Sequence, residues 1–167
     1  MTLLNIRQSS IEDLEALRDI YNYYVLNTPI TFDIEPVDLS DREVWLRQFN
    51  HNDRHFLYTA TNNGKVVGYA SSSQFRTKAA YNGSVETTIY LHPERIGGGA
   101  GKALYSHLLE QLRNSGTVHR CYGVITLPNE ASVGLHRSLG YHDAGKLTQV
   151  GFKFGQYWDT LWMELPL

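Results

Sequence analysis

The chain has 167 residues, of which 42% are hydrophobic and 19% are charged, and its formal net charge at pH 7 is −2. This length suits one globular domain spanning residues 1–167 with a single core. The small, mixed charge does not favour nucleic-acid binding, which depends on clustered Lys and Arg. No stretch approaches the ~20 apolar residues of a membrane span, and the N-terminus lacks a signal-peptide pattern, so we expect a cytoplasmic protein without membrane attachment.

The first fifty residues predict one strand and two helices. Residues 3–8 have strand composition, and Ser10 is expected to cap a helix whose apolar residues recur every three or four positions. Asn27 and the proline two residues later should end this helix, whose apolar side should lie on a sheet. A second helix is expected to open at Ser40, where a glutamate three residues later completes a capping box, and to end near Asn50.

Two strand-like runs follow, at 55–61 and 65–73, with Asn-Asn-Gly between them. Asn and Gly tolerate the left-handed conformations of tight hairpin turns, so this spacing predicts an antiparallel pair. The polar and aromatic stretch 75–83 is expected to form a loop. It lies just before the most informative part of the chain and is therefore a candidate for function.

That part reads as strand, glycine loop and helix. Residues 87–91 are β-branched and aromatic, and Pro93 should end the strand that they form. Four glycines come next, and a helix is expected to follow them directly and to end near Asn114; the glycines are Gly97, Gly98, Gly99 and Gly101. Glycine allows positive φ and close approach of a ligand to main-chain N–H groups, and a helix N-terminus favours an anion. The sequence therefore predicts a phosphate site, to which Lys102 adds a positive charge.

Two common phosphate-binding patterns do not fit this loop. The dinucleotide pattern G-x-G-x-x-G requires a third glycine at position 102 or 104, where the chain has Lys102 and Leu104. The nucleoside-triphosphate pattern requires glycine at 96 and Ser or Thr at 103, where the chain has Ile96 and Ala103. The loop therefore indicates a different phosphate-containing ligand.

The C-terminal part of the chain adds three strands and a helix. Residues 121–127 are strand-like, and Pro128-Asn129 should open a helix that Gly140 closes. Two more strands are expected at 144–152 and 157–164. Strands and helices are thus mixed along the chain without a repeat or a linker, which predicts an α/β domain.

Four stretches together resemble the GNAT superfamily of N-acetyltransferases, and within it the phosphinothricin and methionine sulfoximine acetyltransferase branch. They are IYNYYVLNTPITFDIEPV from Ile20, QFRTKAAYNGSVETTIYLHP from Gln74, NEASVGLHRSLGY from Asn129 and VGFKFGQYWD from Val150. The glycine loop resembles motif A of that superfamily, although Ile96 takes the usual Gln or Arg place and Arg95 lies one residue early. The resemblance implies a GNAT fold, with a central, mostly antiparallel twisted sheet flanked by helices. It also implies a homodimer that transfers acetyl from acetyl-coenzyme A to an amine by direct attack in a ternary complex.

The same resemblance implies which residues bind acetyl-coenzyme A. The end of the strand and the glycine loop should hold the pantetheine arm and the pyrophosphate. Asn129 resembles the superfamily's pantetheine-contacting asparagine, although a helix N-cap explains this residue equally well. The expected cofactor-binding residues are Ile89, Tyr90, Leu91, Gly97, Gly98, Gly99, Ala100, Gly101, Lys102, Asn129 and Ser132.

Three residues are expected to act in catalysis. Glu86 matches the characteristic glutamate of the branch and would accept the amine proton directly or through water; the alternative is a surface carboxylate. The backbone N–H of Leu91 would stabilise the tetrahedral oxyanion. His136 stands where superfamily members often place a Tyr that protonates the departing thiolate, and a structural histidine is the alternative.

The acceptor is expected to bind next to Glu86. Arg76 should hold a carboxylate or phosphinate through its bidentate guanidinium, and aromatic residues should form an apolar wall, with core packing as the alternative for Phe32. The chain departs from the branch here, with Asn82 where Arg is common and Thr87 where His is common. The expected acceptor-binding residues are Phe32, Phe75, Arg76, Thr77, Tyr81, Val85, Glu86 and Thr87.

Other chemistries have little support in the sequence. His51 and His55 have helical spacing for a metal ion, but no third ligand is evident, so no metal is expected. The main hypothesis is an acetyl-coenzyme A-dependent N-acetyltransferase for the α-amine of a small amino acid or analogue, of the methionine sulfoximine, methionine sulfone or phosphinothricin class. An acetyltransferase for another amine, such as a peptide N-terminus or a polyamine, and a non-catalytic coenzyme A-binding sensor are the alternatives.

Overall fold

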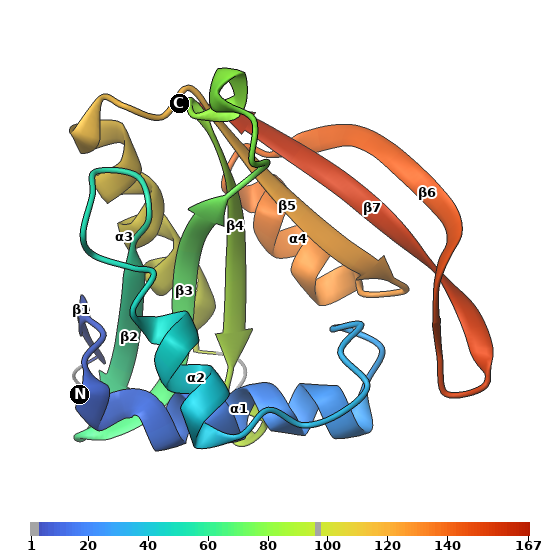
Figure 1. Ribbon diagram of the computed structural model, residues 1–167, viewed down its shortest axis with the longest axis horizontal. Helices are drawn as coiled ribbons and strands as arrows, with labels where there is room; N and C mark the ends of the chain where they lie inside the picture. Colours follow the sequence, from blue (N-terminus) through green and yellow to red (C-terminus); the bar gives the residue numbers. More distant parts are fainter. Residues whose placement is uncertain (1–3, 96–97) are drawn as a thin grey trace.

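The computed structural model describes residues 4–95 and 98–167, so the predicted site residue Gly97 lies outside the described residues. These residues form a seven-stranded sheet with helices on both faces (Figure 1). The strands are β1 (Leu4–Gln8), β2 (Leu57–Asn62), β3 (Lys65–Gln74), β4 (Ser84–Leu91), β5 (Arg120–Leu127), β6 (His142–Lys153) and β7 (Gln156–Pro166). The helices are α1 (Leu14–Asn27), α2 (Leu39–Leu46), α3 (Ala100–Ser115) and α4 (Glu130–Ser138), with 3-10 turns η1 (Ile11–Asp13), η2 (Ala79–Tyr81) and η3 (Pro93–Arg95).

The strands follow the order β1-β2-β3-β4-β5-β7-β6, and all neighbours are antiparallel except β4 and β5. This arrangement confirms the predicted, mostly antiparallel sheet flanked by helices. The parallel pair is short, because it joins only residues 84–86 to residues 120–122. Beyond that point β4 and β5 diverge and leave a gap between them (Figure 1).

Two apolar clusters hold the layers together. The larger one lies between α3 and the sheet, where Leu104, Leu108 and Leu112 recur on the buried side of the helix. The smaller one lies on the other face, where Leu17 and Ile20 of α1 pack with buried residues of β2 and β3. The sheet is therefore covered on both faces, with α1 and α2 on one and α3 and α4 on the other (Figure 1).

The second helix differs from its predicted bounds. It begins at Leu39, because Asp38 is the N-cap and its carboxylate accepts the backbone N–H of Asp41 at 2.8 Å. The hydroxyl of Ser40, which was the predicted cap, instead donates to the Asp38 carboxylate. The helix ends at Leu46 rather than near residue 50. Asp and Ser are comparably good caps, so local preference alone does not choose between them.

Other predicted boundaries agree more closely with the structure. Ser10 is the N-cap of the 3-10 turn η1, which leads directly into α1, and its backbone N–H donates to the Asp13 carboxylate at 2.9 Å. The Asn63-Gly64 turn has φ angles of 50° and 75°, as its two left-handed positions require. The two C-terminal strands are longer than predicted and form an extended hairpin (Figure 1). None of the described helices is both long and apolar enough for a membrane crossing.

Candidate active site

The divergence of β4 from β5 exposes one edge of β4. The N–H of His92 donates to the carbonyl of Val67, beside β3, at 2.9 Å. Along an antiparallel strand, successive residues direct their backbone N–H and C=O groups alternately toward one neighbouring strand and toward the other. Since His92 bonds on the β3 side, the backbone groups of Ile89 and Leu91 point the other way, toward β5. The Leu91 carbonyl accepts the Tyr24 hydroxyl at 2.6 Å. Its N–H, the predicted oxyanion donor, faces the gap that β5 leaves.

The N-terminus of α3 lies beside this gap. Gly99 is its N-cap, with φ of 80°, and no side chain caps the helix. The N–H of Ala103 donates to the Gly99 carbonyl, so the N–H groups of the first three helical residues lack intrahelical acceptors. These groups and the positive end of the helix dipole have the character of the predicted anion site.

Two glycines near this helix start have different roles. A Cβ at Gly99 would meet no atom of the described residues within 4 Å, which leaves space in front of it for a ligand. A Cβ at Gly101 would instead lie 3.0 Å from the Leu91 side chain. Gly101 is therefore needed for close packing of α3 on β4, which corrects the prediction that its missing side chain makes room for the phosphate.

A groove of about 350 Å³ connects the N-terminus of α3 with that of α4. Asn129 caps α4 by accepting the N–H of Ser132 at 3.1 Å, so the cap lies at the groove. Gly98 and Ala100, two predicted cofactor residues, adjoin the groove in sequence without lining it. We name this cavity the β4–α4 groove; it is lined by Tyr24, Ile30, Ile89, Tyr90, Leu91, Gly99, Gly101, Lys102, Asn129, Ala131, Ser132 and Leu135.

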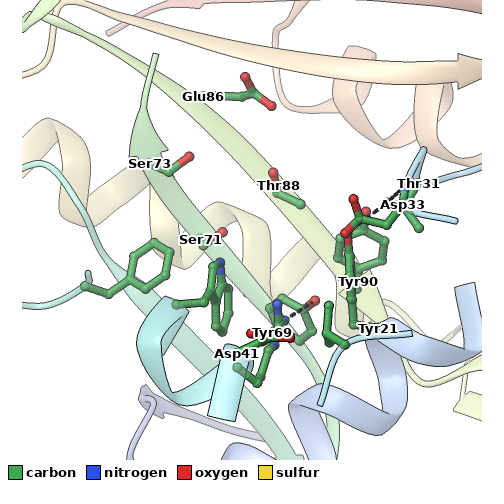
Figure 2. Close-up of a pocket in the computed structure, with 14 residues that line it drawn as sticks. Tyr21, Thr31, Asp33, Asp41, Tyr69, Ser71, Ser73, Glu86, Thr88 and Tyr90 are labelled. Carbon is green, nitrogen blue, oxygen red and sulfur yellow. Dashed lines mark hydrogen bonds between the residues drawn. The ribbon is translucent and has the colours of Figure 1, made fainter. Parts of the chain in front are cut away.

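A second cavity, of about 380 Å³, lies on the α1 and α2 side of the sheet (Figure 2). Alternation along β4 directs Glu86, Thr88 and Tyr90 to this side. Thr88 and Tyr90 also line a small cavity between the diverging strands, and Tyr90 lines the β4–α4 groove, so the cavities meet at the gap. We name the second cavity the α1–α2 pocket; it is lined by Tyr21, Thr31, Asp33, Val37, Asp41, Arg42, Trp45, Phe49, Tyr69, Ser71, Ser73, Glu86, Thr88 and Tyr90.

Glu86 lies where the pocket and the gap come together. It is the last β4 residue paired with β5, opposite Tyr122. Burial raises the pKa of its carboxyl group, and the nearby Arg76 guanidinium partly offsets this effect. A raised pKa makes a carboxylate a better proton acceptor for an amine near neutral pH. The candidate base, the candidate oxyanion donor and the predicted anion site at the start of α3 thus surround one gap.

Arg76 belongs to an aromatic platform beside the pocket rather than to the pocket wall. Its guanidinium lies 4.4 Å from the ring centroid of Phe75 and 5.4 Å from that of Trp162. Phe75 in turn stacks on Tyr122, with the ring centroids 4.5 Å apart. Because Tyr122 pairs with Glu86 across the two strands, this half-buried platform borders the candidate base.

Two predicted acceptor contacts lie on the wrong face of β4. Val85 is fully buried in the cluster beneath α3. Thr87 is 2% exposed, and its hydroxyl is hydrogen-bonded to Tyr105 at 2.8 Å and to Tyr141 at 2.7 Å. Side chains at 85 and 87 alternate with Glu86, so they point away from the α1–α2 pocket. The prediction that Val85 and Thr87 contact the acceptor there is corrected.

Three further predicted residues also lie outside the pocket lining. The ring of Phe32 packs so closely on Gly151 of β6 that a Cβ at this glycine would overlap it. Thr77 is exposed, and Tyr81 is 44% exposed in the 75–83 loop. The wall of the pocket is therefore formed by other residues.

His136 is buried beside the gap. It is 4% exposed, and its Nδ1 donates to the Ser132 carbonyl at 2.8 Å, because a carbonyl oxygen can only accept. Burial lowers the pKa of the imidazole, partly offset by this hydrogen bond, so the ring is neutral at pH 7. The unprotonated Nε2 then faces the Tyr105 hydroxyl at 3.1 Å. This geometry leaves no free N–H and argues against the prediction that His136 protonates the thiolate directly.

The pocket also contains residues that sequence reasoning missed. Tyr21, Arg42, Trp45 and Tyr69 form a cationic and aromatic part of its lining. Burial raises the pKa of Tyr21 to about 12, so its hydroxyl stays neutral. One signal was available: Arg42 precedes Trp45 by three residues and Phe49 by seven, which places the cation on the buried side of the second helix.

Comparison with known proteins agrees with this geometry. Residues 6–162 match the acetyltransferase (GNAT) domain family. The chain is 43% identical to a phosphinothricin N-acetyltransferase of Streptomyces coelicolor, over 98% of this chain and 96% of that protein. It is 36% identical to an L-methionine sulfoximine/L-methionine sulfone acetyltransferase of Pseudomonas aeruginosa, over 98% and 94% of the two chains.

A solved structure extends the agreement to the fold and the cofactor. The crystal structure of a phosphinothricin acetyltransferase from Sinorhizobium meliloti in complex with acetyl-CoA matches with a TM-score of 0.93 at 34% identity, over 98% of this chain and 88% of that one. The open β4 edge and the uncapped start of α3 fit the pantetheine arm and the pyrophosphate of this cofactor. The chain belongs to the GNAT family and is an acetyl-coenzyme A-dependent N-acetyltransferase.

Proposed function

We propose that the acceptor is the α-amine of a small amino acid or analogue of the methionine sulfoximine, methionine sulfone or phosphinothricin class. The observation that carries this proposal is Glu86, a partly buried carboxylate placed where the α1–α2 pocket meets the gap between β4 and β5. The pocket volume of about 380 Å³ suits a small molecule. The relatives named for such substrates match over nearly the full chain, which supports the same acceptor class here.

The proposed transfer is a direct attack within a ternary complex. Glu86 accepts a proton from the acceptor ammonium, and the neutral nitrogen attacks the thioester carbonyl to form the new C–N bond. The N–H of Leu91 donates to the oxyanion that develops on the carbonyl oxygen. Collapse of this intermediate breaks the C–S bond, coenzyme A leaves as a thiolate, and the nitrogen releases its remaining extra proton to solvent. His136 has a positioning role, because its contact with Ser132 fixes the ring within α4 and its contact with Tyr105 joins α4 to α3.

Arg76 is the proposed anchor for the acceptor carboxylate. Its exposed guanidinium borders Glu86, so one amino acid can place its amine on the base and its carboxylate on the cation. We expect replacement of the acceptor carboxylate by an uncharged amide to lower kcat/KM of the native enzyme roughly ten- to hundredfold. Arg76→Ala should cause a similar loss for the acid and little further loss for the amide, since the same interaction cannot be lost twice.

Thiol release at saturating acetyl-coenzyme A measures both effects. Lys78→Ala is the matched control, because Lys78 is an exposed cation in the same loop and should leave the acid-to-amide ratio unchanged. Equal turnover of acid and amide by the native enzyme would contradict carboxylate recognition and favour a peptide N-terminus or polyamine acceptor. Absence of thiol release with every amine would instead favour a coenzyme A-binding sensor.

We also propose that the enzyme is a homodimer. The β6–β7 hairpin exposes Val150, Phe152, Phe154 and Tyr157, each with 52–62% of its surface accessible. Clustered exposed apolar side chains are typical of interaction surfaces, and this hairpin offers them on a long, regular element. Sedimentation equilibrium should give about twice the chain mass of 19.0 kDa, and Phe154→Glu should shift the protein toward monomer. A native protein that sediments as a monomer at micromolar concentration contradicts the proposal.

A further inference from the structure

The α1–α2 pocket contains a buried guanidinium that the proposed transfer does not use. Arg42, on α2, is 5% exposed and lines the pocket. Its Nη2 donates to the Tyr69 hydroxyl at 2.6 Å, and its Cζ lies 3.4 Å from the ring centroid of Trp45. Its Nε has no hydrogen-bond partner among the described residues. Arg42 is therefore buried with part of its donor set unused.

The charge of Arg42 also lacks a counter-ion in the part of the chain that the structure describes. Within residues 4–95 and 98–167, no carboxylate forms an ion pair with it. Arg7, which is far more exposed, is by contrast paired with Asp13 at 2.7 Å. Buried charges in proteins are normally paired, and aromatic faces attract a cation without satisfying its N–H donors. An anion in the pocket would supply the missing partner.

Tyr69 offers a second donor at the same place. Its hydroxyl oxygen accepts from Arg42, so its own hydrogen remains available to another acceptor. Burial raises the pKa of this hydroxyl, which therefore keeps its proton at neutral pH. Arg42 and Tyr69 together form a paired donor site for oxygen atoms.

This donor site and the base lie toward opposite ends of the pocket. Tyr69 is opposite Tyr90 in the sheet, and Glu86 precedes Tyr90 by four residues, or about 13 Å of strand. Figure 2 shows Ser71 and Thr88 between these ends. An acceptor with its amine at Glu86 would therefore direct its side chain along these hydroxyls toward Tyr69 and Arg42.

We propose that Arg42 and Tyr69 bind an anionic oxoacid group, such as a phosphinate, at the end of the acceptor's side chain. This inference rests on the proposed amino-acid acceptor and specifies its side chain. Asp33 and Asp41, both exposed, also line the pocket and would repel an anion placed near them. The anion is therefore directed to the buried cation, and the pocket discriminates among amino acids by the charge at the side-chain end.

Phosphinothricin and methionine sulfone provide a matched pair of probes. Both carry a methyl group and two oxygens on a tetrahedral centre at the end of a two-carbon chain, but only the phosphinate is charged. The native enzyme should have a higher kcat/KM for phosphinothricin than for methionine sulfone. Arg42→Gln should lower this preference roughly ten- to hundredfold, because a charge-assisted pair is lost for one acceptor only.

Three further variants separate binding from stability. Arg47→Gln, at the C-cap of the same helix, removes an exposed cation paired with Glu43 and should leave the preference unchanged. Arg42→Lys keeps a charge and should retain part of the preference. Tyr69→Phe keeps the ring, removes the second donor and should lower the preference less than Arg42→Gln does. If Arg42→Gln does not fold, Arg42→Lys, Tyr69→Phe and the native preference still test the proposal.

The results distinguish this proposal from the acceptor class on which it rests. Equal kcat/KM values for the two probes in the native enzyme would overturn a role for Arg42 in anion binding. A lower melting temperature for Arg42→Gln with an unchanged preference would also overturn it and make Arg42 a structural residue of α2. Failure of the native enzyme to acetylate either probe, or any other amino acid, would instead refute the proposed acceptor class.

Discussion

The two faces of β4 carry different halves of the candidate active site. Residues with odd numbers, such as Ile89 and Leu91, face α3 and α4 and line the β4–α4 groove. Residues with even numbers, such as Glu86 and Thr88, face α1 and α2 and line the α1–α2 pocket. In the proposed arrangement one strand separates the cofactor from the acceptor, and the gap beside β5 joins the two sides.

The faces also differ in the kind of group that they offer. The groove is lined largely by apolar side chains, such as Ile30 and Leu135. Its polar groups include backbone N–H groups at the open edge of β4 and at the start of α3, and these are the same whatever the side chain. The pocket presents side chains from α1, α2, β3 and β4, together with the segment that connects the first two helices. We therefore expect binding of the cofactor's phosphates to depend on backbone geometry, and the choice of acceptor to depend on residue identity.

The largest effect expected on the acceptor side is that of Glu86→Gln. Removal of a general base typically costs a hundredfold or more, so kcat should fall by about a factor of 100 near neutral pH. The native rate should decline as pH falls through the raised pKa of Glu86, whereas the variant should lack this step. The deficit should shrink at high pH, where the amine arrives already neutral. The pH profiles of kcat for both proteins measure these differences.

Two observations would change this interpretation. The exposed α3 carboxylate Glu110 is the control, and Glu110→Gln should leave kcat and its pH profile unchanged. If Glu86→Gln loses the same factor at every pH, Glu86 positions the acceptor and is not its base. An increase only in the KM for acetyl-coenzyme A would place Glu86 on the cofactor side and contradict the assignment of the two faces of β4 to different substrates.

A smaller effect is expected on the cofactor side, from Gly99→Val. A side chain at this position would occupy the open space before the helix N-terminus and strain a residue with φ of 80°. The KM for acetyl-coenzyme A should rise about tenfold, which corresponds to a loss of about 1.4 kcal/mol of binding free energy. The KM for the acceptor should change little. Steady-state kinetics with each substrate varied in turn separates the two constants.

Gly116 provides a matched control at the other end of the same helix. It also has positive φ, 66°, and open space where a Cβ would lie. Gly116→Val should lower the melting temperature through the same backbone strain but leave both KM values unchanged. If the two variants change the KM for acetyl-coenzyme A equally, strain explains the result and the anion site is not at Gly99.

The smallest effect concerns stability. Burial raises the pKa of Glu86 in the folded protein. The contribution of this carboxyl group to the free energy of unfolding is therefore complete below its pKa in the unfolded chain, and it is lost as pH rises through its pKa in the folded protein. The ionised carboxylate therefore destabilises the fold at pH 7, and Glu86→Gln should raise the melting temperature slightly, on the order of 1 °C, since solvent screens this partly buried group. The difference should disappear near pH 4. A lower melting temperature for the variant at pH 7 contradicts the burial argument.

Much of the fold and of the cofactor side follows from local pattern. The hairpin turn at Asn63 and Gly64, the helix after the glycine loop and the Asn129 cap all depend on a few neighbouring residues, and the structure agrees with each. Prediction failed where two good local solutions compete, as at Asp38 and Ser40. It also failed where a role depends on a distant neighbour, as for Gly101, whose absent side chain accommodates Leu91.

By itself, then, the sequence determined the α/β class, the order of the elements and the helix after the glycine loop, because short-range spacing specifies these features. The anion site at α3 stays a prediction, as does Glu86 as the base, which the family resemblance supplied. Tertiary structure alone decided that Val85 and Thr87 face the core, that the Leu91 N–H is open, and that Arg42 meets Tyr69 inside the pocket. The physical reason is that strand alternation and packing set the direction of each group. Arg42 and Tyr69 come from segments 27 residues apart, and only the folded sheet brings them together.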